Sequence, residues 1–115
     1  MREVLEKRIQ GHIDDICRFA EIARNKGLLS MEDAVMNCED SVLKAACMLI
    51  VDATPIEKVR GVLEQRIQDE IICGKSEQEV LPLRIITEGV MCITEGVKPD
   101  MIRVRLNEMI ADSKG

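Results

Sequence analysis

The stretch REVLEKRIQGHIDDICRFAEIARNK, residues 2–26 of this 115-residue chain, decides its fold. Apolar residues recur along it at steps of three or four: Leu5, Ile9, Ile13, Ile16, Ala20 and Ala23. This spacing places them on one stripe of an α-helix and leaves the charged residues on the opposite face. The stretch therefore predicts a long amphipathic helix over residues 2–26, and Gly27 is expected to end it as a left-handed cap.

Capping residues divide the next part of the chain into two shorter helices. Ser30 is expected to accept hydrogen bonds from the first-turn amides of a short second helix. Asp40 or Ser41 should cap a third helix over residues 42–52. This third helix is apolar on most of its faces, so it is expected to be the central, most buried element.

The sequence Thr54-Pro55-Ile56-Glu57 marks the start of a fourth helix. Thr54 is the predicted N-cap, Pro55 the first helical residue and Glu57 the acid that closes a capping box. Gly74 should end this helix. Its apolar residues are expected to face inward: Val59, Val62, Leu63, Ile67 and Ile71.

Two prolines indicate where the last two helices begin. Ser76 and Glu79 have the spacing of another capping box, but Pro82 favours a fifth helix that runs from about residue 82 to residue 94. Pro99 is expected to be the first residue of the last helix, since its fixed φ suits that position.

An internal repeat links these segments. Residues 60–68 match residues 2–10 at seven of nine positions, and residues 95–110 parallel residues 52–67 without a gap. The pattern predicts a single all-α domain over residues 1–115, built from a duplicated helical pair. About five to six helices would form a bundle or a short right-handed stack. The alternative is that similar amphipathic helices converged on the same composition.

Composition narrows the class of protein. The chain is 46% hydrophobic and 32% charged, which is typical of a folded domain, and its formal net charge of −5 argues against nucleic acid as a partner. No stretch approaches the roughly 20 apolar residues of a membrane span, and no signal segment opens the chain, so we expect a cytoplasmic protein without direct membrane insertion. The five cysteines form no C-x-x-C pair and are expected to be reduced, mostly buried residues.

Residues suited to catalysis are few. The single histidine, His12, is expected at a helix surface or boundary, and the adjacent Asp14 and Asp15 point in different directions from a helix. No phosphate-binding glycine loop is present. The sequence therefore predicts a protein that is not an enzyme and that holds no cofactor or metal; an enzyme or small-ligand binder that uses Cys or His ranks last among the alternatives.

Opposite charges surround the predicted turn after the first helix. Arg24 and Lys26 precede it, and Glu32 and Asp33 follow it. We refer to these four residues as the charged turn and predict that they bind a partner protein. The alternative is that they cap their own helices or pair locally, which stabilises a fold by at most about 1 kcal/mol.

Two segments resemble the cytoplasmic domain of the flagellar motor stator protein MotA. That family carries an A-R-x-x-G-L-L-x-L-E-like signature, and the matching positions are Ala23, Arg24, Gly27, Leu28, Leu29 and Glu32, with Met31 in place of leucine. A second family segment, V-V-D-G-T-D-P-E-x-[IV]-R-x-x-L-E-x-E-I, is similar to residues 50–67, although Ala53 and Pro55 replace its usual glycine and aspartate. The likeness covers about residues 17–67.

The resemblance implies a function for the charged turn. In the family, the positions of Arg24 and Glu32 engage the rotor protein FliG and transmit torque, so a rotor protein is the implied partner and the membrane-proximal flagellar base the implied location. The transmembrane helices of the family are missing from this sequence, and residues 69–115 have no stator counterpart. A generic helical adaptor or a homo-oligomer without a motor role remains the alternative.

Overall fold

The computed structural model describes residues 2–114, which form six α-helices and one short 3-10 helix. In chain order these are α1 (Arg2–Lys26), η1 (Leu28–Met31), α2 (Glu32–Met36), α3 (Ser41–Val51), α4 (Ile56–Ile72), α5 (Glu77–Glu95) and α6 (Pro99–Lys114). The described residues contain no strand, which confirms the predicted all-α bundle. None of these helices combines the length and apolar character needed to cross a membrane.

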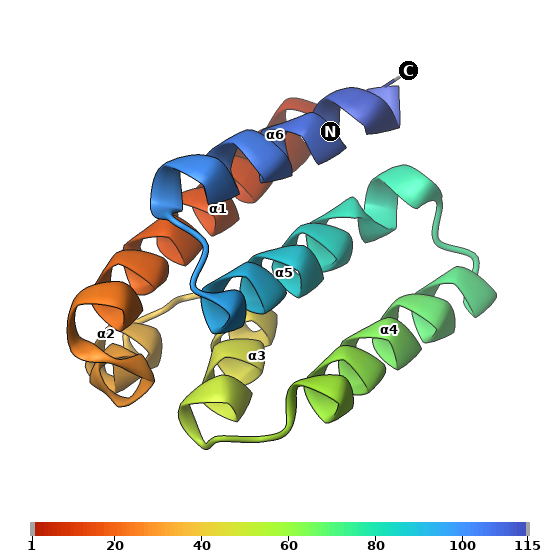
Figure 1. The fold of residues 1–115 in the computed structure, drawn as a ribbon. Helices are drawn as coiled ribbons and strands as arrows, with labels where there is room; N and C mark the ends of the chain where they lie inside the picture. Colours follow the sequence, from red (N-terminus) through yellow and green to blue (C-terminus); the bar gives the residue numbers. More distant parts are fainter. Residues whose placement is uncertain (1, 115) are drawn as a thin grey trace.

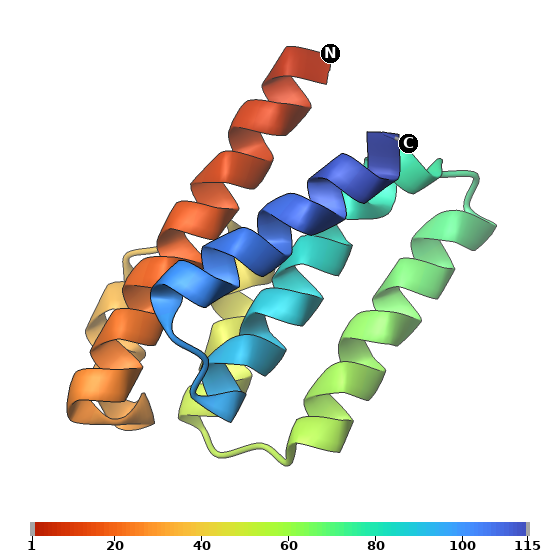
Figure 2. The same ribbon diagram turned by 45° about the horizontal axis from the view of Figure 1, so that its top comes forward.

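Helix α5 lies in the middle of the bundle (Figure 1) and packs against α1, α3, α4 and α6. Helices α1 and α6 lie on one side of it, and α3 and α4 lie on the other. Figure 2 shows α1 and α4 at opposite edges of the bundle. Polar contacts join α1 to α6 in antiparallel order: Asn107 accepts a hydrogen bond from Gln10 at 3.0 Å, and Arg103 pairs with Asp14 at 2.9 Å. The two ends of the described chain therefore lie at the same end of the bundle.

The core is built mostly from aliphatic side chains. The predicted stripe of α1 is confirmed, because Ile9, Ile13, Ile16 and Ala20 are buried, with Leu5 and Ala23 partly buried against the same cluster. The prediction that α3 is the central element was wrong. Helix α5 takes that place because it is longer and contacts neighbours on several sides, with buried residues that run from Val80 to Ile93.

The segment between α1 and α2 differs from the prediction in how its helix ends are capped. Ser30 does not cap α2: it lies inside η1, and its hydroxyl donates to the carbonyl of Lys26 at 2.8 Å. Gly27 has the expected positive φ of 92°, but its ψ of 162° is extended and not left-handed helical. An extended residue lets the chain leave α1 and begin η1 at once.

The start of α4 is shifted by one residue from the prediction. Pro55 is the N-cap, with an extended ψ of 135°, and Ile56 is the first helical residue. Thr54 is therefore not the cap, and no side chain caps this helix, so Glu57 closes no capping box. Val62 was also placed wrongly, since its side chain is 51% exposed.

Other predicted boundaries are confirmed. Asp40 accepts from the amides of Val42 and Leu43 at the start of α3, and Ser76 accepts from the amide of Glu79 at the start of α5. The predicted start of the fifth helix near residue 82 was wrong, since α5 begins at Glu77 and contains Pro82. Gly74 follows α4 with a φ of 98°, and α6 begins at Pro99 as expected.

The two halves of the longer repeat fold alike. Ala53 and Gly96 occupy equivalent positions and have positive φ angles of 61° and 75°. In both turns the amide of the following residue bonds the carbonyl five positions back, from Thr54 to Leu49 and from Val97 to Cys92. These are Schellman ends, and the next helix begins three residues later in each copy. Common origin of the two copies remains a prediction.

Candidate functional site

The charged turn lies on a small lobe formed by the end of α1, η1 and α2. Met31 and Val35 anchor this lobe, since both side chains are fully buried. The hydrogen bond from the Ser30 hydroxyl to the Lys26 carbonyl fastens η1 to the last turn of α1. The turn is thus part of the folded body and presents its side chains from a fixed backbone.

All four residues of the charged turn are exposed, but they do not form one cluster of ion pairs. Arg24 extends from the end of α1 to the neighbouring helix and donates to the backbone carbonyl of Gly96, at the end of α5. Across residues 2–114, Lys26, Glu32 and Asp33 take part in no side-chain ion pair. Arg24 therefore has a structural contact, whereas the other three charges face solvent.

Two apolar side chains stand beside these charges. Leu29 is 74% exposed and Met36 is 52% exposed. Positions 29, 32, 33 and 36 have the three- and four-residue spacing of one helical face, so the carboxylates of Glu32 and Asp33 lie between two apolar residues. The spacing of these positions can be seen in the sequence. The exposure of Leu29 cannot, because it depends on how η1 packs against the rest of the bundle.

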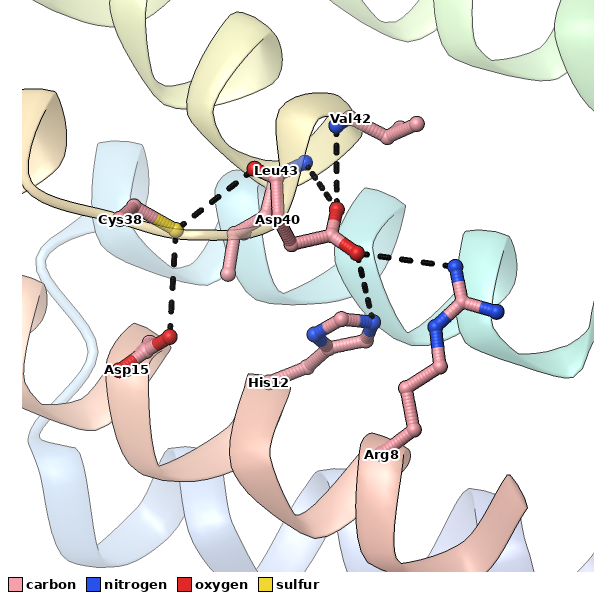
Figure 3. A network of polar contacts seen from close by, with 7 residues as sticks. All are labelled: Arg8, His12, Asp15, Cys38, Asp40, Val42 and Leu43. Carbon is pink, nitrogen blue, oxygen red and sulfur yellow. Dashed lines mark hydrogen bonds and ion pairs between the residues drawn. The ribbon is translucent and has the colours of Figure 1, made fainter. Parts of the chain in front are cut away.

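A second polar group of residues lies at the start of α3 (Figure 3). Asp40 Oδ1 accepts the amides of Val42 at 3.0 Å and Leu43 at 2.9 Å. Its other oxygen lies 3.7 Å from His12 Nε2 and 3.6 Å from an Arg8 guanidinium nitrogen, both from α1. One carboxylate thus caps α3 and ties the start of this helix to α1.

His12 is the buried member of this group. The residue is 4% exposed, which corrects the expected surface or boundary position, and its Nε2 has no hydrogen-bond partner within bonding distance. Burial lowers the pKa of His12, and the nearby Asp40 offsets only part of that effect. The imidazole is therefore neutral near pH 7.

The pKa of Asp40 is also lowered, but the cause is its hydrogen bonds and the charges near it. Burial alone would raise the pKa of this carboxyl, but the Leu43 amide, His12 and Arg8 outweigh it and hold the pKa below its usual value. A carboxylate that accepts backbone amides is stabilised in its charged form. Asp40 is therefore ionised at neutral pH, as a helix cap requires.

Cys38 completes this group without forming a catalytic dyad. Its sulfur lies 3.9 Å from Asp15 Oδ2 and 3.7 Å from the Asp40 carbonyl. Burial raises the pKa of the Cys38 thiol, so it stays protonated at neutral pH. A protonated thiol beside carboxylates is a poor nucleophile, and the group serves to join α1 to α3.

The paired aspartates on α1 face different neighbours, as their helical geometry predicts. Asp14 pairs with Arg103 of α6, whereas Asp15 pairs with Arg18 at 3.2 Å and lies beside Cys38. Among residues 2–114, no set of three or more His, Cys, Asp or Glu side chains has the arrangement of a metal site.

Comparison with known protein families, with curated proteins and with solved structures finds no match to this chain.

Proposed function

We propose that the chain is a non-enzymatic protein-interaction module whose partner contacts the charged turn. The observation that carries this proposal is the set of solvent-facing charges at Lys26, Glu32 and Asp33, which precede and follow the exposed Leu29 in the sequence. Charges of both signs around an apolar residue suit a partner surface of complementary pattern. Such contacts orient a partner and speed its association.

The rotor protein FliG is the specific partner that we propose, because the two signatures that resemble the stator family include this turn. This choice rests on the resemblance at residues 23–32 and 50–67. The binding surface requires no cofactor and no reaction. Its contribution to function is to hold the partner in one orientation while the bundle keeps the turn rigid.

Binding to purified FliG tests both parts of the proposal. We expect Lys26→Glu and Glu32→Lys each to weaken binding by roughly tenfold, and we expect wild-type binding to weaken as salt concentration rises. Lys58→Glu is the matched control, since it makes the same charge change on exposed α4, away from the turn. Calorimetric titration would measure each dissociation constant.

Arg24 differs from the other residues of the charged turn because it also contacts the Gly96 carbonyl, so a change there can alter both folding and binding. An Arg24→Lys variant keeps the charge but loses the planar guanidinium, so its thermal unfolding reports the structural contact and its titration reports binding. Absence of binding to FliG would reject the rotor partner. Binding that is equal in wild type, Lys26→Glu and Glu32→Lys would reject the charged turn as the contact surface.

A further inference from the structure

Helix α4 lies at one edge of the bundle (Figure 2). It packs against α3 and α5, and its buried residues are Val59, Leu63 and Ile67. At its carboxyl end Ile72 is 79% exposed. An edge helix with exposed apolar residues is a suitable surface for a further helix.

One row of residues along α4 and at its C-cap, Cys73, borders a shallow hollow in the surface: Val62, Gln65, Arg66, Asp69, Glu70 and Cys73. Their spacing of three and four positions places them along one side of the helix. Near Val62 and Arg66 the row also borders a groove whose α3 wall includes Ala45 and Leu49. We refer to the six residues as the α4 row.

The α4 row is complementary to itself in reverse order. If two copies lie antiparallel, with a two-fold axis midway between positions 67 and 68, Arg66 faces Asp69 of the second copy and Asp69 faces its Arg66. In the same register Val62 faces Cys73, and Gln65 faces Glu70. A parallel alignment would instead place Arg66 against Arg66, which is repulsive.

The charges of the row are available for such a contact. Within residues 2–114, neither Arg66 nor Asp69 takes part in an ion pair. The side-chain amide of Gln65 donates to Asp69 Oδ1 at 2.9 Å, which holds that carboxylate along the row. A two-fold contact needs one patch that matches itself, and the α4 row satisfies this requirement.

We propose that α4 is a homodimer interface, in which two copies of this chain pair their α4 rows antiparallel in this register. The contact is confined mainly to one helix from each copy, so the buried area is at the low end for protein interfaces and the dimer dissociates on dilution. The α4 row is separate from the charged turn. Lys26→Glu and Glu32→Lys should therefore leave the dimer unchanged.

Disulfide trapping tests the register. In a Val62→Cys variant the new thiol would lie opposite the native Cys73 of the second copy, so mild oxidation should yield a covalent dimer on a non-reducing gel. Positions 62 and 73 of one helix lie about 16 Å apart along its axis, too far for an intramolecular bridge. The trapped dimer should disappear in Val62→Cys combined with Cys73→Ser.

Gln68→Cys is the control for this experiment. Position 68 is exposed and lies close to the proposed axis, but it points to another side of α4. It should yield no more covalent dimer than the wild type. Equal trapping in Val62→Cys and Gln68→Cys would overturn the proposed register, and ready trapping of the wild type through Cys73 alone would favour a parallel pair.

A charge exchange tests the interface without oxidation. Sedimentation of the wild type should show a mass that rises with protein concentration. Arg66→Asp and Asp69→Arg should each weaken the dimer by roughly tenfold, and the double exchange should restore it because the row is again self-complementary. Circular dichroism would verify that each variant is folded. A wild type that stays monomeric at all concentrations, or a double exchange that stays as weak as the single ones, would overturn the proposal.

Discussion

At the scale of single residues, Ala53 has a backbone conformation that suits glycine better. Its φ of 61° lies in the left-handed region, whereas the equivalent positions after α4 and α5 are occupied by Gly74 and Gly96. An L-residue with a Cβ is disfavoured there by about 1–2 kcal/mol. The turn forms nonetheless because the two Schellman hydrogen bonds of Thr54 and Ala53 close the end of α3.

Ala53→Gly should therefore stabilise the fold. We expect the free energy of unfolding to rise by about 0.5–1 kcal/mol, since the strain removed exceeds the added chain entropy of glycine. Urea denaturation would measure it. Ala45→Gly is the matched control, because Ala45 is exposed within α3 and the same change there should destabilise by about 1 kcal/mol. A loss of stability in Ala53→Gly would contradict this account of the turn.

At the scale of the helices, glycine has opposite roles at two positions. Gly89 of α5 is buried against α1, and a Cβ built on it would lie 2.5 Å from Cδ1 of Ile16 and 3.0 Å from its Cγ2. Ile16 is itself fully buried, so it has little space to move. Gly61 of α4 is exposed, and a Cβ there would meet no neighbour within 4 Å.

The same substitution should thus change stability in opposite directions. Gly89→Ala should destabilise the bundle by about 1–3 kcal/mol through overpacking between α1 and α5. Gly61→Ala should stabilise it by up to about 1 kcal/mol, because alanine favours an exposed helix. Thermal unfolding would measure both. Ile16→Val removes Cδ1, the methyl group nearest to position 89. The double variant Gly89→Ala, Ile16→Val should therefore be more stable than expected from the sum of the two single changes. If the two changes are simply additive, the crowding lies elsewhere.

The ends of the helices show what could be predicted from the sequence. Asp40, Ser76 and Pro99 lie where predicted because each acts on the backbone within three residues of itself. Ser30 and Thr54 have equally suitable side chains, but the chain enters the next helix through η1 and through Pro55 respectively. Local chemistry thus offers several caps, and the packing of the neighbouring helices decides which one is used.

At the scale of the whole molecule, contacts between residues far apart in the sequence determine which side chains of the candidate site are held in place or buried. The Arg24 contact with the Gly96 carbonyl joins positions 72 residues apart, and Asp40 meets His12 only because the turn before α3 lies against α1. No periodicity along the chain reports such contacts. The sequence therefore predicted where the charged turn lies, but not that Arg24 is held by α5 or that His12 is buried.

The burial of His12 predicts a loss of stability in acid. Its pKa is lowered from 6.5 in the fold, so below pH 6.5 the unfolded chain binds a proton that the folded chain does not. The free energy of unfolding should fall as the pH is lowered from 6.5 towards the folded pKa. Asp40, whose pKa is also lowered, adds a loss only below its usual 3.8. Urea denaturation between pH 7 and 4.5 would measure the slope, and in His12→Gln we expect it to flatten. An unchanged slope in that variant would assign the effect to other groups.

The buried thiols predict a second loss of stability, in alkali. Burial raises the pKa of Cys47 from 9.0 to about 12, with smaller contributions from Cys38 and Asp15. Above pH 9 the unfolded chain releases the thiol proton and the folded chain keeps it, so stability should fall by about 1.4 kcal/mol per pH unit for this group.

The stability of the bundle should therefore be greatest between about pH 6.5 and 9, because His12 limits it on one side and the thiols on the other. Guanidinium denaturation from pH 8 to 10.5 would measure the alkaline side under reducing conditions. Cys47→Ala should reduce the slope, although it lowers stability at every pH by leaving a small cavity. Cys73→Ala is the control, since Cys73 is exposed. If Cys73→Ala reduces the slope as much as Cys47→Ala does, burial of the Cys47 thiol is not its cause.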